Sequence, residues 1–205
     1  MRWPFGRHAP DNPEMREIRE FFNRAAADEE HYPSTIDPRI FHVKLVLEHL
    51  GDAARVADVG CGKGRFARIV REHGAQVIAL DVAEAMLQHV PEGISRCAAT
   101  MTALPLKSAC CDGAYATESL EHAVDIPKAV GELCRIVRPG GRIAIIDKNA
   151  EAWGRLETPA WERWFSRREL EKLLARDCRE VSCRPISYWE DVEPDGLFLA
   201  WLAVK

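Results

Sequence analysis

The sequence predicts an α/β fold, in which a mostly parallel sheet is covered by helices on both faces. From Arg55 onward, short apolar runs alternate with helical patterns, as in parallel sheets. A glycine-rich turn over residues 60–64 stands between an apolar run and a helix, and the next apolar run ends in Asp81. This order is typical of a strand–turn–helix unit that binds a nucleotide, with the acid placed to accept hydrogen bonds from ribose hydroxyls.

Two helices are expected before the first strand. The first covers residues 13–28, where apolar side chains form one stripe. The second covers residues 38–50, with Asp37 as N-cap, Pro38 in the first helical position and Gly51 as the stop. Because these helices precede the nucleotide-binding pattern, we expect them to form a lid or a flank.

The chain is expected to be a single domain. The first twelve residues contain prolines and a glycine and are expected to be a loose tail. Residues 1–51 would form the helical lid, and residues 52–205 the nucleotide-binding core. Its strands are expected over residues 56–59, 76–81, 94–99, 112–117, 142–147, 179–188 and 197–204, with helices over residues 65–73 and 125–137 and after the capping box at Ser166 to Glu169. The last two strands form a hairpin around Pro194-Asp195-Gly196.

The composition excludes several classes of protein. The chain has 205 residues, 47% of them hydrophobic and 29% charged, which suits one globular domain with its own core. A net charge of −4 predicts no nucleic-acid partner. There is no stretch long enough for a membrane span and no signal peptide, so a cytoplasmic protein is expected. The seven cysteines lack Cys-x-x-Cys spacing, which favours reduced thiols and no metal site.

Five short motifs follow one another along the expected strands. They are Asp58 to Gly64, Leu80 to Leu87, Ala103-Leu104-Pro105-Leu106, Ala116 to His122, and Val137 to Arg142. In this order they resemble the motifs of the class I S-adenosylmethionine-dependent methyltransferases. The resemblance runs from about Arg55 to the C-terminus. It implies a Rossmann-like, seven-stranded, mostly parallel sheet with an antiparallel last strand, and S-adenosylmethionine as the cofactor.

The resemblance assigns the glycine turn to the cofactor. Asp58 and the backbone of Gly60 would face the methionine amino group, and Cys61, Gly62 and Gly64 complete the cradle. Glycine suits such a turn because it adopts positive φ and carries no Cβ that would keep a ligand away.

The adenosine end of the cofactor is assigned to the next two motifs. Asp81 would bind the ribose hydroxyls, and Val82 would lie against adenine. The family usually has an acid before its Ala-Leu-Pro segment, whereas Thr100 followed by Met101 stands here. Because a hydroxyl carries no charge, we expect a weaker contact with the adenine amine, or a backbone substitute.

The candidate catalytic residues follow the fourth strand. Thr117 and Glu118 would approach the methionine end or the methyl acceptor. His122 is a candidate general base, because the ordinary pKa of histidine lies near neutrality. Alternatively, His122 only caps or packs at the start of a helix. Tyr32 either closes over the cofactor from the lid or is a surface residue.

A long connection over residues 148–165 interrupts the alternation and carries three tryptophans. It leaves the edge of the sheet at which open α/β folds bind ligands. Trp153 and Trp164 are therefore expected to line the acceptor side of the pocket. Alternatively, they anchor the connection against the core.

These features indicate a methyltransferase with a small-molecule acceptor. Two other hypotheses stay open. The chain could be a catalytically inactive regulatory protein that binds S-adenosylmethionine, or a methyltransferase that acts on protein or RNA. The latter is disfavoured because Thr117 to Leu120 replaces an Asn-Pro-Pro-Tyr-type motif and no basic stripe is present. The glycine spacing and the terminal hairpin disfavour a nicotinamide dehydrogenase. The identity of the acceptor and the oligomeric state are not specified by the sequence.

Overall fold

The structure is a computed structural model that describes residues 12–37 and 39–205. The expected tail, up to residue 11, and the expected helix start at Pro38 lie outside the described residues. No helix within the described ranges is long and apolar enough to cross a membrane.

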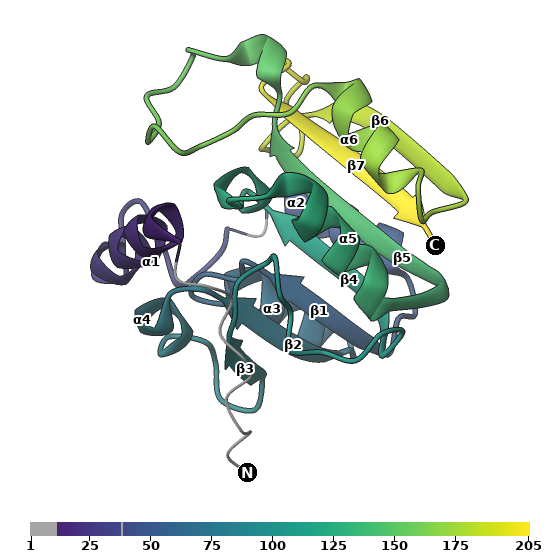
Figure 1. The fold of residues 1–205 in the computed structure, drawn as a ribbon, viewed down its shortest axis with the longest axis horizontal. Coiled ribbons are helices and arrows are strands. Elements are labelled where there is room, and N and C mark those ends of the chain that lie inside the picture. The colour runs from purple at the N-terminus through teal and green to yellow at the C-terminus, as the bar shows by residue number, and fades with distance from the viewer. Residues whose placement is uncertain (1–11, 38) are drawn as a thin grey trace.

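One seven-stranded sheet forms the centre of the molecule, in the order β3-β2-β1-β4-β5-β7-β6 (Figure 1). The strands are β1 Arg55–Val59, β2 Gln76–Asp81, β3 Ser95–Ala98, β4 Cys111–Thr117, β5 Val137–Lys148, β6 Glu180–Ile186 and β7 Phe198–Val204. Strand β7 pairs antiparallel with β5 and β6, and the other pairings are parallel. The Rossmann-like fold with an antiparallel last strand is therefore confirmed.

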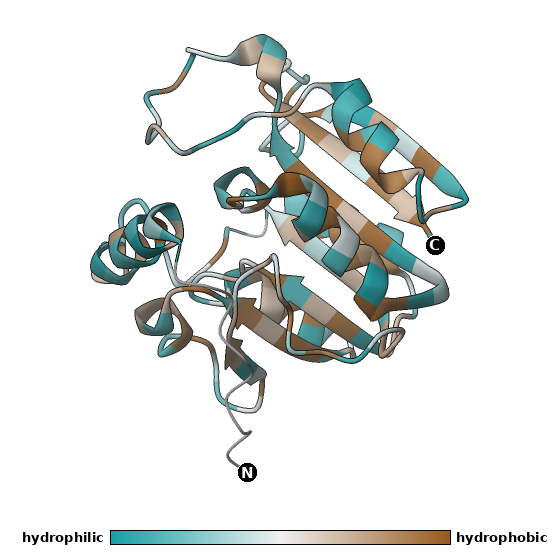
Figure 2. Ribbon diagram, in the orientation of Figure 1, coloured by the Kyte–Doolittle hydropathy of each residue, from teal (hydrophilic) through white to brown (hydrophobic). Residues whose placement is uncertain are grey.

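Helices cover both faces of this sheet. They are α1 Pro13–Ala25, α2 Phe41–Leu50, α3 Arg65–Glu72, α4 Glu84–Leu87, α5 Ile126–Ile136 and α6 Arg167–Leu174, with short 3₁₀ helices η1 Leu120–His122 and η2 Ala150–Ala152. Alternate residues of the strands point to opposite faces. One hydrophobic core therefore lies under α5 and α6, and a second under α2 and α3. Figure 2 shows the apolar residues running along the strands between these layers.

Helix α2 begins three residues later than expected. Asp37 does not cap it, because its carboxylate accepts the backbone N–H of Arg39 at 2.9 Å and the guanidinium at 2.7 Å. Ile40 takes the N-cap position without a side-chain hydrogen bond. The expected end of the first helix is likewise corrected: α1 stops at Ala25, and Asp28 instead accepts the backbone N–H groups of the turn that follows.

The C-terminal ends of the parallel strands meet at one edge of the sheet. The glycine turn follows β1, Asp81 ends β2, Glu118 follows β4, and Lys148 ends β5. Helices α1 and α4 lie beyond this edge (Figure 1). The topology therefore brings segments that are far apart in the sequence to one place.

Candidate active site

Three hydrogen bonds donated by backbone amides shape the turn after β1. The N–H groups of Gly60 and Cys61 both donate to the Leu80 carbonyl, at 2.8 and 3.0 Å. The next amide, of Gly62, donates to Asp81 Oδ2 at 2.8 Å. The turn is therefore attached to the end of β2, and the carboxylate expected to bind ribose is already held by the turn expected to cradle the cofactor.

The glycines of the turn serve different purposes. Gly60, Gly62 and Gly64 all have positive φ, at 78°, 52° and 76°. A Cβ on Gly60 would lie 2.5 Å from both Met101 Cε and Ser119 Cβ, so packing requires glycine there. A Cβ on Gly62 would meet no atom within 4 Å. Gly62 therefore borders open space in which a ligand can approach the backbone.

This open space belongs to a cavity of about 1100 Å³, including its mouth. The residues that were predicted for the site and line the cavity are Asp58, Gly60, Cys61, Gly62, Asp81, Val82, Thr100, Met101, Thr117, Glu118 and His122. Gly64 does not line it and instead precedes α3 as its N-cap residue.

Asp58 is a buried carboxylate without a partner for one of its oxygens. The residue is 1% exposed, and its Oδ2 has no hydrogen-bond partner among the described residues. Burial raises the pKa of Asp58 to about 7. The nearby Tyr115 hydroxyl opposes this shift, and the charge of Asp81 adds to it. A buried, unsatisfied carboxylate is costly. A cationic group of a ligand in the cavity would supply the missing donor.

Asp81 is held from two sides. In addition to the Gly62 amide on Oδ2, the Ala83 N–H donates to Oδ1 at 2.8 Å. Burial raises the pKa of Asp81, although these backbone donors oppose the shift. Close by, the Thr100 and Thr102 hydroxyls lie 3.0 Å apart and bond to each other. The hydroxyl expected to reach adenine is thus partly occupied within the protein.

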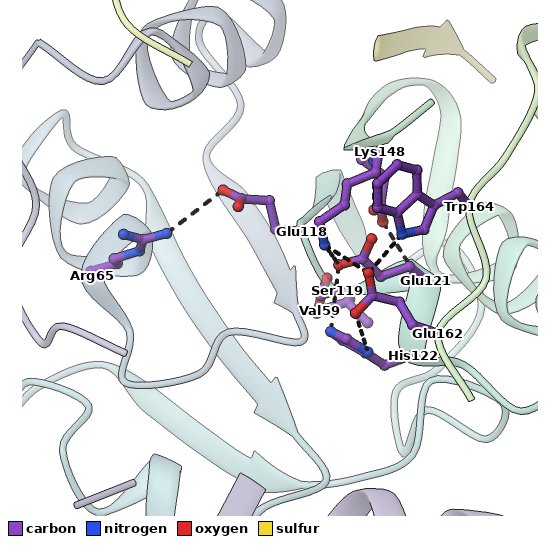
Figure 3. Close-up of polar contacts among 10 residues, drawn as sticks. Val59, Arg65, Glu118, Ser119, Glu121, His122, Lys148, Glu162 and Trp164 are labelled. Carbon is purple, nitrogen blue, oxygen red and sulfur yellow. Dashed lines mark hydrogen bonds and ion pairs between the residues drawn. The ribbon is translucent and has the colours of Figure 1, made fainter. Parts of the chain in front are cut away.

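Glu118 lines the cavity in a left-handed backbone conformation, with φ of 50°. Its Oε1 lies 3.3 Å from His42 Nδ1. The same oxygen lies 3.7 Å from Arg65 Nη2, a contact drawn in Figure 3. Burial alone would raise the pKa of Glu118, but the contact with His42 and the charge of Arg65 outweigh it and lower the pKa. Glu118 therefore presents a negative charge to the cavity near neutral pH.

A buried ionic network lies beside the cavity and was not predicted from the sequence (Figure 3). Lys148 Nζ contacts Glu121 Oε1 at 2.5 Å and Glu162 Oε1 at 3.0 Å. The indole N–H of Trp164 donates to the same Glu162 oxygen at 2.7 Å. Burial and the neighbouring Asp147 raise the pKa of Glu121. The residues of the network come from separate segments, with Glu121 in η1, Lys148 at the end of β5 and Glu162 in the connection that follows, so no local sequence pattern indicated it.

His122 connects this network to the cavity. Its Nε2 lies 3.5 Å from Glu121 Oε1, and its ring packs edge-on against Phe22 with centroids 4.9 Å apart. Burial and the positive charge of Lys148 lower the pKa of His122 to about 3. The imidazole is therefore neutral at neutral pH. It can accept a hydrogen bond, but it is a weak base.

The network also has the arrangement of metal ligands. Glu121, His122 and Glu162 each offer one ligand atom, and these atoms lie within 4.8 Å of one another. However, Lys148 already contacts both carboxylates. A cation would have to displace this ammonium group, so the cluster is better described as an ion-pair network.

Helix α1 forms the outer wall of the cavity through Met15, Ile18 and Phe22. Tyr32 also lines the cavity, and its ring contacts Phe22 with centroids 5.9 Å apart. Asn23 attaches the helix to α4 by accepting the Ala85 N–H at 2.9 Å. The first helix was expected from the sequence to form a lid or a flank, but its apolar stripe did not indicate which side chains reach the cavity, because the same stripe would serve ordinary packing.

The two tryptophans expected on the acceptor side lie elsewhere. Trp153 is 58% exposed, and Trp164 is buried against Lys148, 5.8 Å from the ammonium. Neither lines the cavity. The expectation is corrected because the connection is bound to the far strands: the Asn149 N–H donates to the Leu197 carbonyl at 2.8 Å. Trp164 fits the alternative, in which it anchors the connection.

Comparisons with known proteins agree with this geometry. A methyltransferase-domain family matches residues 57–145. Malonyl-[acyl-carrier protein] O-methyltransferase of Pectobacterium atrosepticum is 30% identical over 181 residues, covering 85% of this chain and 70% of the relative. The O-methyltransferase resE of Aspergillus sclerotiorum is 37% identical over 165 residues, which cover 70% of this chain and 61% of the relative. The chain belongs to the class I S-adenosylmethionine-dependent methyltransferases, and it is an enzyme of this class.

A solved structure shows the same fold. The 1,6-didemethyltoxoflavin-N1-methyltransferase of Burkholderia thailandensis, with bound 1,6-didemethyltoxoflavin and S-adenosylhomocysteine, superposes with a TM-score of 0.74. The match covers 98% of this chain and 93% of that one, at 23% identity. At this identity the likeness concerns the fold alone.

The ionic network gives a stability prediction. Lys148→Met removes the ammonium that contacts the buried carboxyl groups of Glu121 and Glu162. We therefore expect the free energy of unfolding to fall by about 3–5 kcal/mol. Lys44→Met breaks an ion pair with Glu190 in which both side chains are about two-fifths exposed. That variant should lose less than about 1 kcal/mol. Urea denaturation followed by circular dichroism measures both, and similar small losses would contradict a compensating role for Lys148.

Asp58 gives a prediction that depends on pH. Because its pKa is about 7 in the folded protein and roughly 3.9 in an unfolded chain, folding holds the proton while the unfolded chain releases it. The loss of folding stability caused by this difference in pKa is absent below about pH 4, grows as the pH rises, and is complete above about pH 7. Asp58→Asn should therefore stabilise the ligand-free protein, by on the order of 2 kcal/mol more at pH 8 than at pH 5. Denaturant unfolding of both proteins at about pH 5 and pH 8 measures this. The same stabilisation by Asp58→Asn at both pH values would refute the prediction.

Proposed function

We propose that this enzyme transfers the methyl group of S-adenosylmethionine to a small-molecule acceptor within the cavity under α1. The observation that carries the proposal is the unsatisfied Asp58 carboxylate, which lies beside the open backbone of Gly62 and the held carboxylate of Asp81. An unpaired buried carboxylate fits the methionine ammonium. An unobstructed glycine backbone fits the close approach of a ligand.

The cofactor would extend between two ends of the cavity. Asp58, with the Gly60 to Gly62 backbone, would hold the amino acid end. Asp81 would accept the ribose hydroxyls, and Val82, Thr100 and Met101 would lie along the base. The two Asp81 oxygens each receive one backbone N–H and retain lone pairs for these hydroxyls. Gly64 would act indirectly, by starting α3.

The cofactor supplies a methyl group that its sulfonium already activates. The protein's contribution is therefore to align the acceptor and to exclude water, and alignment alone can contribute several kcal/mol. The neutral His122 would accept a hydrogen bond from the acceptor's nucleophile, and Thr117 and the ionised Glu118 would lie at the methionine end of the cofactor. Because the pKa of His122 is about 3, it would orient the nucleophile more than deprotonate it.

The lid supports an acceptor of small size. Met15, Ile18 and Phe22 of α1 close one side of the cavity with apolar surface, and Tyr32 adds to it. Helix α2 lies instead against the sheet, so within residues 1–51 we assign the lid to α1 and its following turn. The seven cysteines are free, which fits the reducing cytoplasm that we propose as the location.

A second candidate comes from the relatives. The 30% identical enzyme of P. atrosepticum is named for a malonyl group on an acyl-carrier protein. An acyl group delivered by a carrier protein would still enter the cavity as a small molecule, but its recognition would include the carrier. The same apolar wall serves both cases.

Binding of the demethylated cofactor tests the first half of the proposal. Asp81→Ala should lower the affinity for S-adenosylhomocysteine by roughly ten- to hundredfold, the range for charge-assisted hydrogen bonds. Gly62→Val should abolish binding, because φ of 52° is strained for a β-branched residue. Asp112→Ala is the control, since that carboxylate pairs with Arg138 near the start of β4. Calorimetry that shows a preference for a nicotinamide dinucleotide would end this assignment.

Transfer of labelled methyl groups tests the second half. Incubation with radiolabelled S-adenosylmethionine and a cell extract, followed by acid precipitation, separates small products from proteins. We expect label in the soluble fraction and less of it with Phe22→Ala, since that ring closes the cavity. Label confined to the protein precipitate would favour the carrier-bound acceptor. Profiling a deletion strain for a compound lighter by one methyl group would then identify the acceptor.

A further inference from the structure

His42 is a buried imidazole with a single polar contact. It lies on α2 and is 0% exposed, with its ring edge-on to those of Tyr188 and Phe198 at centroid distances of 4.9 Å. Its Nδ1 lies 3.3 Å from Glu118 Oε1. By hydrogen-bond geometry neither ring nitrogen has a partner within the described ranges, so the approach to Glu118 is an electrostatic contact. Packing alone does not explain an imidazole here, because an apolar residue would avoid the cost of burying two polar atoms.

Glu118, the partner of His42, is held in an unusual way. Its φ of 50° is rare for a residue with a side chain, and such conformations are strained. The backbone is fixed by the Glu118 N–H, which donates to the Ile146 carbonyl at 2.7 Å. Its side chain keeps 24% exposure while contacting His42. The strained turn therefore directs this carboxylate along the cavity wall, with His42 behind it.

Arg65 completes a pair of opposite charges. Its Nη2 lies 3.7 Å from Glu118 Oε1, longer than the 2.7–2.9 Å of a charge-assisted hydrogen bond. Its Nη1 lies 3.5 Å from the Tyr188 hydroxyl. Both Arg65 and Glu118 line the cavity, so each keeps hydrogen-bonding capacity for a ligand. A cation and an anion at this spacing complement an α-amino acid group, which carries one carboxylate and one ammonium.

We propose that His42 is a positioning residue, which holds Glu118 so that Glu118 and Arg65 together bind the amino acid end of the cofactor. Glu118 takes the ammonium, jointly with Asp58, and Arg65 takes the carboxylate. An ammonium has three donors, enough for both carboxylates. This inference rests on the proposed use of the cavity by S-adenosylmethionine.

The charges around Glu118 define the effect of removing His42. The groups that face it are His42 from α2, Arg65 from α3, His122 from η1, Lys148 from β5, and Tyr188 after β6. Burial acts to raise the pKa of Glu118, and His42 is the largest opposing influence. Without His42 the pKa rises, so Glu118 loses charge as the pH falls. The contribution of Glu118 to binding is then smaller at pH 6 than at pH 8.

Two probes separate positioning from general damage. S-Adenosylhomocysteine carries the amino acid end, and 5′-methylthioadenosine lacks it. In calorimetry on the full chain, His42→Leu should weaken S-adenosylhomocysteine about tenfold, more at pH 6 than at pH 8, and leave 5′-methylthioadenosine within about twofold. His42→Gln, which keeps an N–H donor, should recover most of the loss. His49→Leu is the control, because it removes an imidazole from the same helix. The Nε2 of His49 lies 3.1 Å from the Ala203 carbonyl.

Glu118→Gln repeats the comparison at a partly exposed side chain, so it keeps the test valid if His42→Leu does not fold. It should lower the affinity for S-adenosylhomocysteine and leave the affinity for 5′-methylthioadenosine nearly unchanged. Equal weakening of both probes by the His42 and Glu118 variants would overturn the inference and leave His42 a packing residue. So would unchanged affinity for S-adenosylhomocysteine. If the unaltered protein bound neither probe, the proposed function itself would fail.

Discussion

The donation of two successive amides, from Gly60 and Cys61, to the Leu80 carbonyl is the interaction on which the site depends. It joins the turn after β1 to the last residues of β2, whose register is set by the pairing of Val59 with Leu80. Once these are joined, the next amide reaches Asp81 without further adjustment. Two segments about twenty residues apart therefore form one rigid unit before any ligand is present.

The same edge concentrates carboxylates, and the structure treats them in two ways. Glu121 and Glu162 are compensated by Lys148, which keeps them buried without a ligand. Asp58 receives no such partner on Oδ2. A fold that minimised its own free energy would neutralise both sets. The contrast separates carboxylates that brace the site from one that is left for a ligand, and it illustrates how binding sites are maintained at a cost in stability.

Local patterns predicted the alternating strands and helices of the sheet and the turn that follows its first strand, because the relevant residues are consecutive along the chain, whereas the antiparallel last strand was implied by the family resemblance. The glycine turn and Asp81 are such cases. The remaining parts depend on long-range packing. Phe22 and His42 have the sequence pattern of any apolar helix face, and only the fold shows that one borders the cavity and the other supports Glu118. Trp153 was misplaced because nothing local indicates that its segment is bound to β7.

The lid and the chemistry of the site are linked through Phe22. Its ring covers His122, and burial is the main reason that the pKa of His122 is about 3. The position of α1 therefore determines both access to the cavity and the basicity of the histidine inside it. With α1 in place, the imidazole stays neutral and can only accept a hydrogen bond. Were the ring withdrawn and water admitted, the pKa would return toward its ordinary value, and His122 would become a better base at the moment the cavity lost its protection from solvent. The closed arrangement favours chemistry that needs alignment in a dry space more than it needs proton removal, which is what an activated methyl donor requires.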